Sequence, residues 1–287
     1  MHQTRASHLT WSLLLVVPGL LLIIGLVLLP LVDMGEASFR RQDFGIIQPG
    51  FTVDNYWQIL TSATYFELFY KTGAAALTVT LLCALLGYPV ALLLAAAPAR
   101  RKAILYFLVA APLLINQVVR TYGWLLVLGN RGVVNTILIG LGVIDAPLKL
   151  SGNTLGMVIG ATQVFLPFMI LSLAASLENI DRRQLESAEI LGAGRIRRFI
   201  TIVLPLSMPG LIAGSVLVFS LMLGAIVTPL MLGGSAIRYL SVAIFTDAMV
   251  LFDLPRATAL SALLLLVVLA VYIIQRRYVR TYKERVA

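Results

Sequence analysis

The chain has 287 residues, of which 60% are hydrophobic and only 12% are charged. About a quarter of the residues of a soluble domain are charged, so this composition has too few polar groups to cover a water-facing surface. Soluble enzymes, disordered tails and nucleic-acid-binding domains are therefore poor fits, although the formal net charge is +9. The single cysteine, Cys83, excludes a disulfide framework and a cysteine-based metal site. Both histidines lie in the first ten residues, so no histidine-based metal site is expected either.

Six apolar stretches are long enough to cross the ~30 Å hydrocarbon core of a bilayer as helices. They predict an all-α membrane protein with six transmembrane helices, organised as one membrane domain over residues 1–287. The first stretch is longer than the core of a signal peptide and no clear cleavage site follows it, so we interpret it as a retained anchor. The stretches are Trp11–Val32, Thr72–Ala97, Ala103–Leu128, Leu155–Leu177, Met208–Leu232 and Ala257–Ile274.

Lysine and arginine are distributed unequally between the loops on the two sides of the predicted membrane. One side, which includes both termini, carries 14 of the 22 basic residues, whereas the longer loops on the other side carry seven. Basic residues concentrate in cytoplasmic loops, so both termini are predicted to be cytoplasmic and the protein to be a multi-pass component of a bacterial inner membrane. The basic C-terminal tail is expected to contact anionic lipid head groups, and no nucleic-acid partner is expected.

The predicted spans contain no carboxylate, and Arg120 is their only charged residue. Proton- and ion-coupled carriers usually need ionisable groups inside the membrane, which disfavours a self-sufficient secondary carrier or channel but leaves it as the alternative. A membrane enzyme is the weaker alternative, because no cluster of acids, histidines or cysteines lies in the interior. No G-x-x-x-x-G-K phosphate-binding loop is present, so any work derived from ATP must come from a partner chain.

The loop 178–207, between the fourth and fifth stretches, is the longest predicted cytoplasmic segment. Asp181 is a favourable helix N-cap, and Gln184 three residues later completes a capping box. Gly192 suits the left-handed residue that ends a helix. The loop therefore predicts a short helix of its own outside the bilayer.

This helix is expected to be amphipathic and to be followed by a second short helix, Ala193–Ile200. Leu185, Ala188 and Leu191 fall on one face of the first helix. Capping and amphipathicity alone leave two interpretations open. The two helices form either an element that docks a partner protein or a solvated hairpin that lies on the membrane surface.

The same loop resembles the "EAA" loop of permease subunits of ABC importers. Glu186-Ser187-Ala188, Gly192 and Ile202-Val203-Leu204-Pro205 match the pattern E-A-A-x(3)-G-x(9)-I-x-L-P in spacing throughout. The single departure is Ser187 in place of the first alanine, and serine is still small enough for close packing. The resemblance implies that the loop couples the permease to an ATPase. The implied coupling residues are Glu186, Ser187, Ala188, Leu191 and Gly192.

Further short matches resemble the spermidine/putrescine branch of these permeases and extend over about residues 10–280. They are Gly87-Tyr88-Pro89, Val119–Trp124, the Gly224 to Gly234 segment and Asp253–Ala257. The sequence departs from that branch at Ala225 and Leu230, where the branch often carries acids. The implied cargo is therefore a polyamine or a related small amino-containing solute.

The resemblance also implies the partners of the chain. It implies a second permease subunit, usually different from the first, so that two chains form the translocation path. Two copies of an ABC ATPase would bind on the cytoplasmic side, and a periplasmic substrate-binding protein would deliver the cargo. The chain itself would be non-catalytic and without a cofactor, because ATP and Mg²⁺ would be bound by the ATPase.

Polar side chains inside the spans are candidates for the translocation path. Arg120 would cost about 2.5–3.5 kcal/mol at the centre of the bilayer on insertion scales, so it is expected to face the protein interior. Two roles stay open for it: a residue that lines or gates the path, or a structural tie to backbone carbonyls or a partner subunit. We favour the structural tie, because an arginine repels a cationic cargo. The candidate path residues are Asn116, Gln117, Arg120, Tyr122, Gln163 and Ser220.

Overall fold

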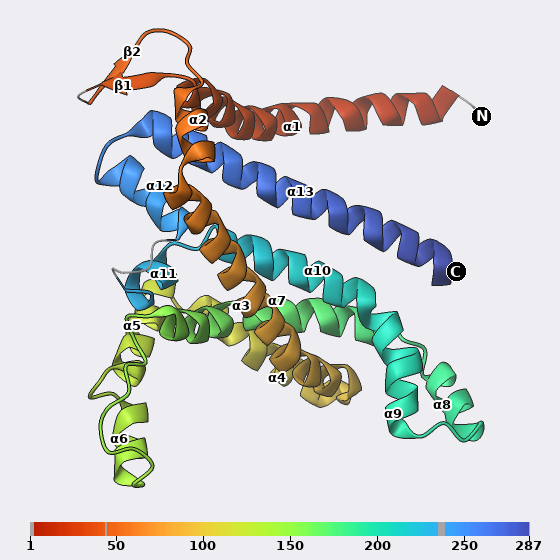
Figure 1. Cartoon of the computed structure of the whole chain (residues 1–287). Coiled ribbons are helices and arrows are strands. Elements are labelled where there is room, and N and C mark those ends of the chain that lie inside the picture. Colours follow the sequence, from red (N-terminus) through yellow and green to blue (C-terminus); the bar gives the residue numbers. More distant parts are fainter. Residues whose placement is uncertain (1–2, 44, 235–238, 287) are drawn as a thin grey trace. The chain divides into compact units, whose positions relative to one another are not determined.

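The structure is a computed structural model that describes residues 3–43, 45–234 and 239–286, without the side chains of residues 3–16, 20, 182 and 278–286. Within this part of the chain, six helical segments are long and apolar enough to span a membrane, which confirms the predicted class (Figure 1). They are Val17–Ser38, Ala63–Ala96, Gln117–Gly140, Thr154–Glu178, Arg195–Leu223 and Leu254–Arg277. The prediction of one domain over residues 1–287 includes residues 1–2, 44, 235–238 and 287, which lie outside the described residues.

The chain divides into two compact units, which we describe separately: residues 1–62 with 246–263, and residues 63–245 with 264–287. The first unit contains α1 (Gln3–Ser38), the antiparallel strands β1 (Arg41–Asp43) and β2 (Ile46–Gln48), and α2 (Asp54–Thr61). The Asn55 amide ties α2 to the end of α1, because it donates hydrogen bonds to the carbonyls of Ser38 and Arg40 at 3.0 and 2.8 Å.

The first unit also holds the corner between α12 (Leu240–Met249) and α13 (Leu254–Val286). Arg256 donates two hydrogen bonds of 2.9 Å to the buried carboxylate of Asp247 and lies 3.3 Å from Asp253. A bidentate arginine–carboxylate pair fixes the orientation of both groups. Arg256 therefore forms ion pairs with Asp247 and Asp253, and these pairs fix the start of α13.

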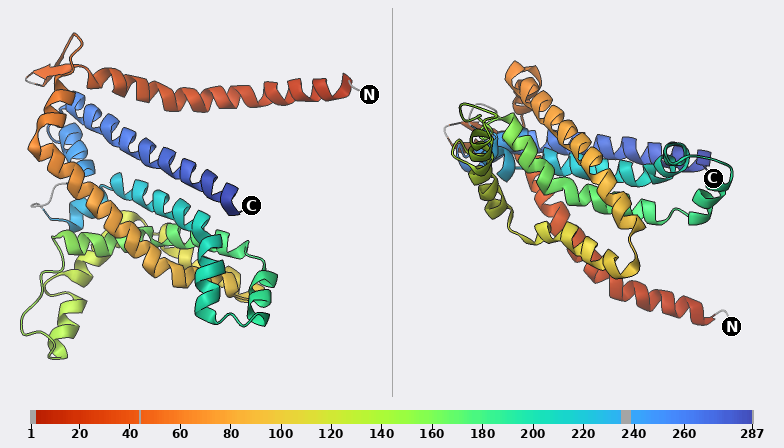
Figure 2. Two further views of the ribbon diagram at one scale, coloured as in Figure 1. Left: turned by 45° about the vertical axis from the view of Figure 1, so that its right-hand side comes forward. Right: turned by 90° about the horizontal axis from the view of Figure 1, so that it is seen from below.

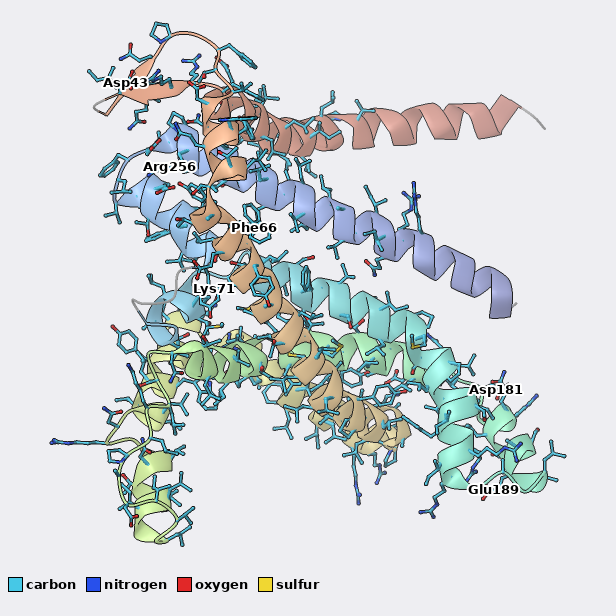
Figure 3. All side chains as sticks on the ribbon, in the orientation of Figure 1. Asp43, Phe66, Lys71, Asp181, Glu189 and Arg256 are labelled. Carbon is cyan, nitrogen blue, oxygen red and sulfur yellow. The ribbon has the colours of Figure 1, made fainter. Side chains whose placement is uncertain are left out.

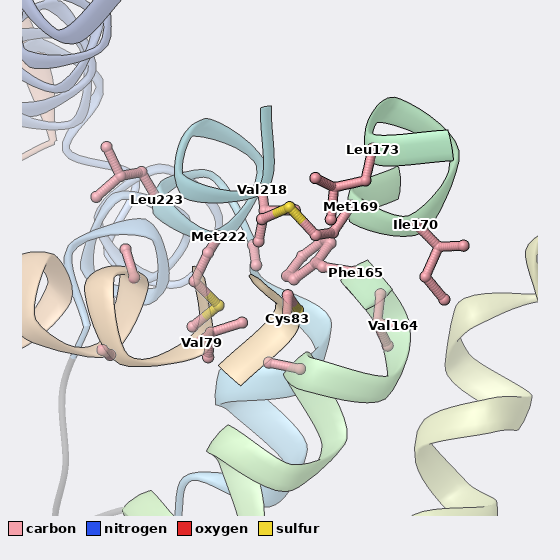
Figure 4. Close-up of a cluster of buried hydrophobic side chains, with 14 of the residues drawn as sticks. Val79, Cys83, Val164, Phe165, Met169, Ile170, Leu173, Val218, Met222 and Leu223 are labelled. Atoms are coloured by element: carbon pink, nitrogen blue, oxygen red, sulfur yellow. The ribbon is translucent and has the colours of Figure 1, made fainter. Parts of the chain in front are cut away.

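The second unit is built around α7 (Thr154–Glu178), which packs between α3 (Ala63–Ala96) and α10 (Leu204–Leu223). The three helices share a core in which Cys83 of α3, Met169 of α7 and Met222 of α10 are almost completely buried (Figure 4). Small residues allow close approach of helices in membranes, and Gly210 and Gly214 of α10 face α7.

The remaining elements of this unit are short. They are α4 (Ala99–Ala110), the 3₁₀ helix η1 (Ala111–Leu114), α5 (Gln117–Leu128), α6 (Val133–Gly140), α8 (Arg182–Ile190), α9 (Arg195–Arg198), the π-helix η2 (Phe199–Val203) and α11 (Val227–Leu232). The hairpin formed by α8 and α9 lies at the end of α7 in each of the views (Figures 1 and 2).

Two of the predicted stretches are interrupted. The stretch 103–128 is divided among α4, η1 and α5, because Pro112 lacks an N–H and Asn116 starts a new helix by accepting a hydrogen bond from the Val118 amide at 2.8 Å. The stretch 208–232 is also divided, because α10 ends at Leu223 and α11 begins at Val227. Within each of these two stretches, the break in the helix therefore leaves backbone groups that are not held in helical hydrogen bonds.

Candidate functional site

The hairpin that follows α7 has well-defined helix ends, as its sequence predicts. The Asp181 carboxylate accepts a hydrogen bond of 2.9 Å from the Arg183 amide and so caps α8. Gly192 has a φ of 79°, its amide donates to the Glu189 carbonyl, and the Ala193 amide donates to the Ala188 carbonyl, each at 2.9 Å. This pair of bonds is a Schellman motif, so α8 ends in a fixed turn.

The second arm of the hairpin differs from the predicted isolated helix over residues 193–200. α9 begins at Arg195, continues through η2 and enters α10 without a break in helical backbone. The hairpin is therefore attached directly to the helix that contains the fifth span, whereas Asn179, Ile180 and Asp181 connect it to α7.

The structure separates the three residues that were predicted to share the apolar face of α8. Leu185 and Ala188 are half-buried, whereas Leu191 is 86% exposed. Leu191 instead joins Ile190, also 86% exposed, and Ile196, 76% exposed, and we call these three residues the hairpin tip. The tip is an exposed apolar surface at the turn between α8 and α9, which is the property that a docking element needs.

A cavity of about 530 Å³ lies between the hairpin and the ends of α3, α4 and α7. Its apolar wall includes Leu92, Leu177 and Leu185, and its charged residues are Lys102, Glu178, Glu186, Glu189 and Arg198. Figure 3 shows Asp181 and Glu189 at the two ends of α8. Glu186 is exposed at the edge of this cavity, so its carboxylate is accessible to a partner protein.

Two ion pairs surround the cavity. Lys102 lies 2.8 Å from Glu178, and Arg198 donates a hydrogen bond of 2.6 Å to Glu189, which connects α9 to α8. Tyr106 of α4 also donates to Glu178 at 2.6 Å.

Three of the six candidate path residues meet at a second cavity, of about 570 Å³. Asn116, Gln117 and Arg120 line it together with Phe165, Phe168 and apolar residues of η1, α7 and α10. Arg120 donates a hydrogen bond of 2.8 Å to the Pro112 carbonyl, which ties α5 back to η1. Its Nε atom is buried and has no hydrogen-bond partner among the described residues.

The other three candidate path residues do not line this cavity. Gln163 accepts a hydrogen bond of 3.2 Å from the Trp124 indole, which is the helix-bridging role open to an isolated glutamine. Tyr122 is exposed and Ser220 is half-buried on α10.

The sequence singled out no role for Tyr88, which the structure places beside the hairpin. The Tyr88 hydroxyl lies 2.6 Å from Ser207 Oγ, and its ring packs against Phe199. The only indication in the sequence that Tyr88 has a role was its position inside the Gly87-Tyr88-Pro89 match. Its partners are more than one hundred residues away along the chain, so their proximity is a property of the tertiary structure.

The chain is similar to known transport proteins over nearly its whole length. A family model described as "Binding-protein-dependent transport system inner membrane component" matches residues 9–284. The spermidine/putrescine transport system permease protein PotB of Escherichia coli is 34% identical over 256 residues, which are 89% of this chain and 93% of PotB. The inner membrane ABC transporter permease protein YdcU of Escherichia coli is 31% identical, over 86% of this chain and 81% of YdcU.

The fold is also similar to that of a solved transporter. A chain of a bacterial ABC transporter involved in the import of the acidic polysaccharide alginate superposes with a TM-score of 0.70 and 19% identity. The superposition covers 96% of this chain and 97% of that one. At this level of identity the likeness concerns the fold alone.

Proposed function

The chain belongs to the family of inner-membrane components of binding-protein-dependent transport systems, and we propose that its cargo is a polyamine or a related small amino-containing solute. It is a non-catalytic permease subunit of an ABC importer and a multi-pass protein of the bacterial inner membrane. The observation that carries the cargo assignment is the 34% identity to PotB, which extends over 93% of that protein. The alternative of a self-sufficient carrier or channel falls away with the family membership.

Two residues, Ala225 between α10 and α11 and Leu230 within α11, are the reason for keeping the proposed class of solute broad. Ala225 and Leu230 stand where the polyamine branch often carries acids, and Leu230 is exposed while Ala225 is buried. Among the residues that the structure describes, no carboxylate lines the cavity at Asn116, Gln117 and Arg120. A solute with fewer positive charges than spermidine fits this lining better, because each unpaired ammonium group would lose hydration without gaining a counter-charge.

The hairpin is proposed to be the docking element for the ATPase, on the cytoplasmic side. This orientation is supported by the excess of basic residues in the loops on that side and by the apolar hairpin tip. The proposed complex contains two ATPase copies that bind ATP and Mg²⁺, a second permease subunit of different sequence and a periplasmic binding protein. The solved alginate transporter is described in complex with a periplasmic protein bound to an alginate pentasaccharide.

The test is uptake by proteoliposomes that contain the chain with its partner permease and ATPase, with the binding protein added outside. Radiolabelled putrescine and spermidine are the probes, and molybdate is the unrelated control solute. We expect ATP-dependent uptake of at least one polyamine, none of molybdate, and no uptake by the chain alone. Uptake of neither polyamine, under conditions where the binding protein stimulates ATP hydrolysis, would refute the cargo assignment.

A further inference from the structure

A π-helix joins the hairpin to α10. The backbone passes from α9 into η2 after Arg198 and from η2 into α10 after Val203. Pro205 has no N–H and therefore cannot donate the helical hydrogen bond to the carbonyl of Thr201. π-helical turns inside α-helices are rare, occur frequently at functional positions and are sites where helices bend. The link between the hairpin and the membrane can therefore bend at Phe199–Val203.

One side chain from another helix contacts the first residue of this π-helix and a residue beyond its other end. The ring centroid of Tyr88, on α3, lies 5.5 Å from that of Phe199, with the two ring planes at 80°. The hydroxyl of the same tyrosine lies 2.6 Å from Ser207 Oγ, beyond the other end of the π-helix. An edge-to-face ring pair and a short hydrogen bond thus bridge the segment that can bend.

The direction of this hydrogen bond follows from the surroundings of Ser207. Its hydroxyl donates to the Leu204 carbonyl at 3.0 Å, and a serine hydroxyl has only one proton. The Tyr88 hydroxyl is therefore the donor to Ser207 Oγ. Ser207 is fully buried, and a buried polar group that loses its hydrogen-bond partner is destabilised by the full cost of its desolvation. Bending of the π-helix away from Tyr88 would break this hydrogen bond and is therefore unfavourable.

The hairpin has space in which to move. The cavity of about 530 Å³ separates α8 from the ends of α3, α4 and α7. Within the described part of the chain, the main packing partner of α8 is α9. The position of the hairpin relative to the spans therefore depends on α9, on the π-helix and on the contacts that Tyr88 makes across it.

We propose that Tyr88 is a positioning residue that fixes the angle between the hairpin and the fifth span. A displacement of the hairpin by the ATPase is then passed to α3 and α10 together. Without the hydrogen bond from Tyr88 to Ser207, the π-helix absorbs the displacement, and ATP is hydrolysed with less transport. This proposal rests on the proposed docking of the ATPase at the hairpin, and it adds how the movement reaches the membrane.

The chain offers a closely matched control. Tyr56 donates to Ser38 Oγ at 2.8 Å, and the Ser38 hydroxyl donates to the Gly35 carbonyl at 2.6 Å. This is the same tyrosine–serine–carbonyl arrangement, with a fully buried serine, but it joins α2 to α1. The test variants are Tyr88→Phe, Ser207→Ala and the double variant, and the controls are Tyr56→Phe and Ser38→Ala.

Two measurements on the complete transporter separate this proposal from the cargo assignment. The first is the number of polyamine molecules taken up per ATP hydrolysed. The second is the distance between spin labels at Gln184→Cys, an exposed position on α8, and Leu217→Cys on α10, in a Cys83→Ala background, with and without ATP. The second measurement does not depend on the cargo.

We expect Tyr88→Phe, Ser207→Ala and the double variant to bind the ATPase normally and to lose uptake per ATP to the same extent. The expected loss is about fivefold, the size of effect that one net hydrogen bond has on an equilibrium. The ATP-dependent change in label distance should increase in all three, because the hairpin then moves without α10. The two controls should behave as wild type.

Four outcomes would overturn the proposal. They are unequal losses in Tyr88→Phe and Ser207→Ala, additive losses in the double variant, an equal loss in Tyr56→Phe, and label distances that do not respond to ATP in wild type. If neither polyamine is taken up while the label distances change as described, the cargo assignment fails and the role of Tyr88 stands.

Discussion

The Ser172 hydroxyl of α7 donates a hydrogen bond of 2.9 Å to the backbone carbonyl of Gly210 on α10. The two backbones can approach this closely only because residue 210 has no side chain. A Cβ at this position would overlap the Ser176 side chain and would come within 2.7 Å of the Ser172 carbonyl oxygen. One turn further on, a Cβ on Gly214 would lie 2.8 Å from the Met169 sulfur.

Gly210→Ala is therefore expected to destabilise the protein by about 1–3 kcal/mol, the usual cost of overpacking a tight interior. The matched control is Gly123→Ala on α5, where nothing lies within 4 Å of the added Cβ. Thermal unfolding of the purified protein in detergent measures both. An unchanged midpoint for Gly210→Ala, or an equal loss in both variants, would show that the α7–α10 crossing relaxes without cost.

Gly192→Ala is expected to weaken binding of the ATPase. The left-handed backbone at Gly192 costs an L-residue about 1–2 kcal/mol, although nothing lies within 4 Å of an added Cβ, so the effect is conformational. We expect roughly five- to thirtyfold weaker binding, measured by ATPase titration on membranes. Gly194→Ala, two residues away at a φ of −63° and equally unobstructed, should bind as wild type. Equal affinities of Gly192→Ala and Gly194→Ala for the ATPase would show that the left-handed turn at Gly192 does not contribute to docking.

The hairpin tip should be buried when the ATPase docks. Leu191→Asp places a charge on this apolar surface, and we expect it to abolish stable association, because burial of one leucine side chain contributes about 1.5–3 kcal/mol. Leu141→Asp replaces another exposed leucine, beyond α6, and should leave association intact. Glu186→Ala should have a smaller effect than Leu191→Asp, because Glu186 lies at the cavity edge rather than at the tip. Retention of the ATPase by Leu191→Asp in a pull-down would contradict this docking surface.

Arg120→Ala should lower the amount of assembled complex more than the transport rate per complex. Its guanidinium holds the Pro112 carbonyl at the junction of η1 and α5, and loss of a hydrogen bond from a charged group costs about 1.5–3 kcal/mol. Size-exclusion chromatography of the solubilised complex and uptake per complex separate the two effects. Normal assembly with abolished or re-directed transport would establish a gating role instead.

The orientation can be tested by cysteine accessibility. Ser187 on α8 and Asp145 in the loop after α6 are both exposed and are predicted to lie on opposite sides of the membrane. In a Cys83→Ala background, an impermeant maleimide added to spheroplasts should label Asp145→Cys but not Ser187→Cys. Both should react once the membrane is permeabilised. Labelling of Ser187→Cys in intact spheroplasts would reverse the proposed topology.

The number of spans and the ends of α8 could be predicted because they depend on local sequence, whereas the third apolar helix long enough to span runs over Gln117–Gly140 instead of Ala103–Leu128. Length and hydropathy alone determine whether a helix can cross a bilayer. The Asp181 cap and the Gly192 turn depend on the residues that form them. The exposed position of Leu191 could not be predicted from the period of α8, because this residue lies at the end of the helix, where the chain turns at Gly192 and no other described element covers it.

Interactions between distant residues could not be predicted from one sequence. Tyr88 and Ser207 are separated by 119 positions, and a tyrosine in an apolar span has many alternative partners. The division of the stretch 103–128 was also missed, because its average hydropathy is high enough for a span and so conceals the effect of Pro112 and the cap at Asn116. The charge of Arg120 led to the expectation that it faces the protein interior, and the structure places it half-buried at the cavity that Asn116 and Gln117 also line.

The π-helix Phe199–Val203 also determines the direction in which the hairpin points. A π-turn accommodates about one residue more than an α-turn, and each α-helical residue contributes 100° of rotation and about 1.5 Å of rise. Because the wider turn absorbs this extra residue, the same residues in continuous α-helical geometry would rotate α9 about the α10 axis by roughly that angle. A hairpin transplanted between related permeases must therefore bring its own π-turn, because otherwise the same docking residues would face a different part of the ATPase.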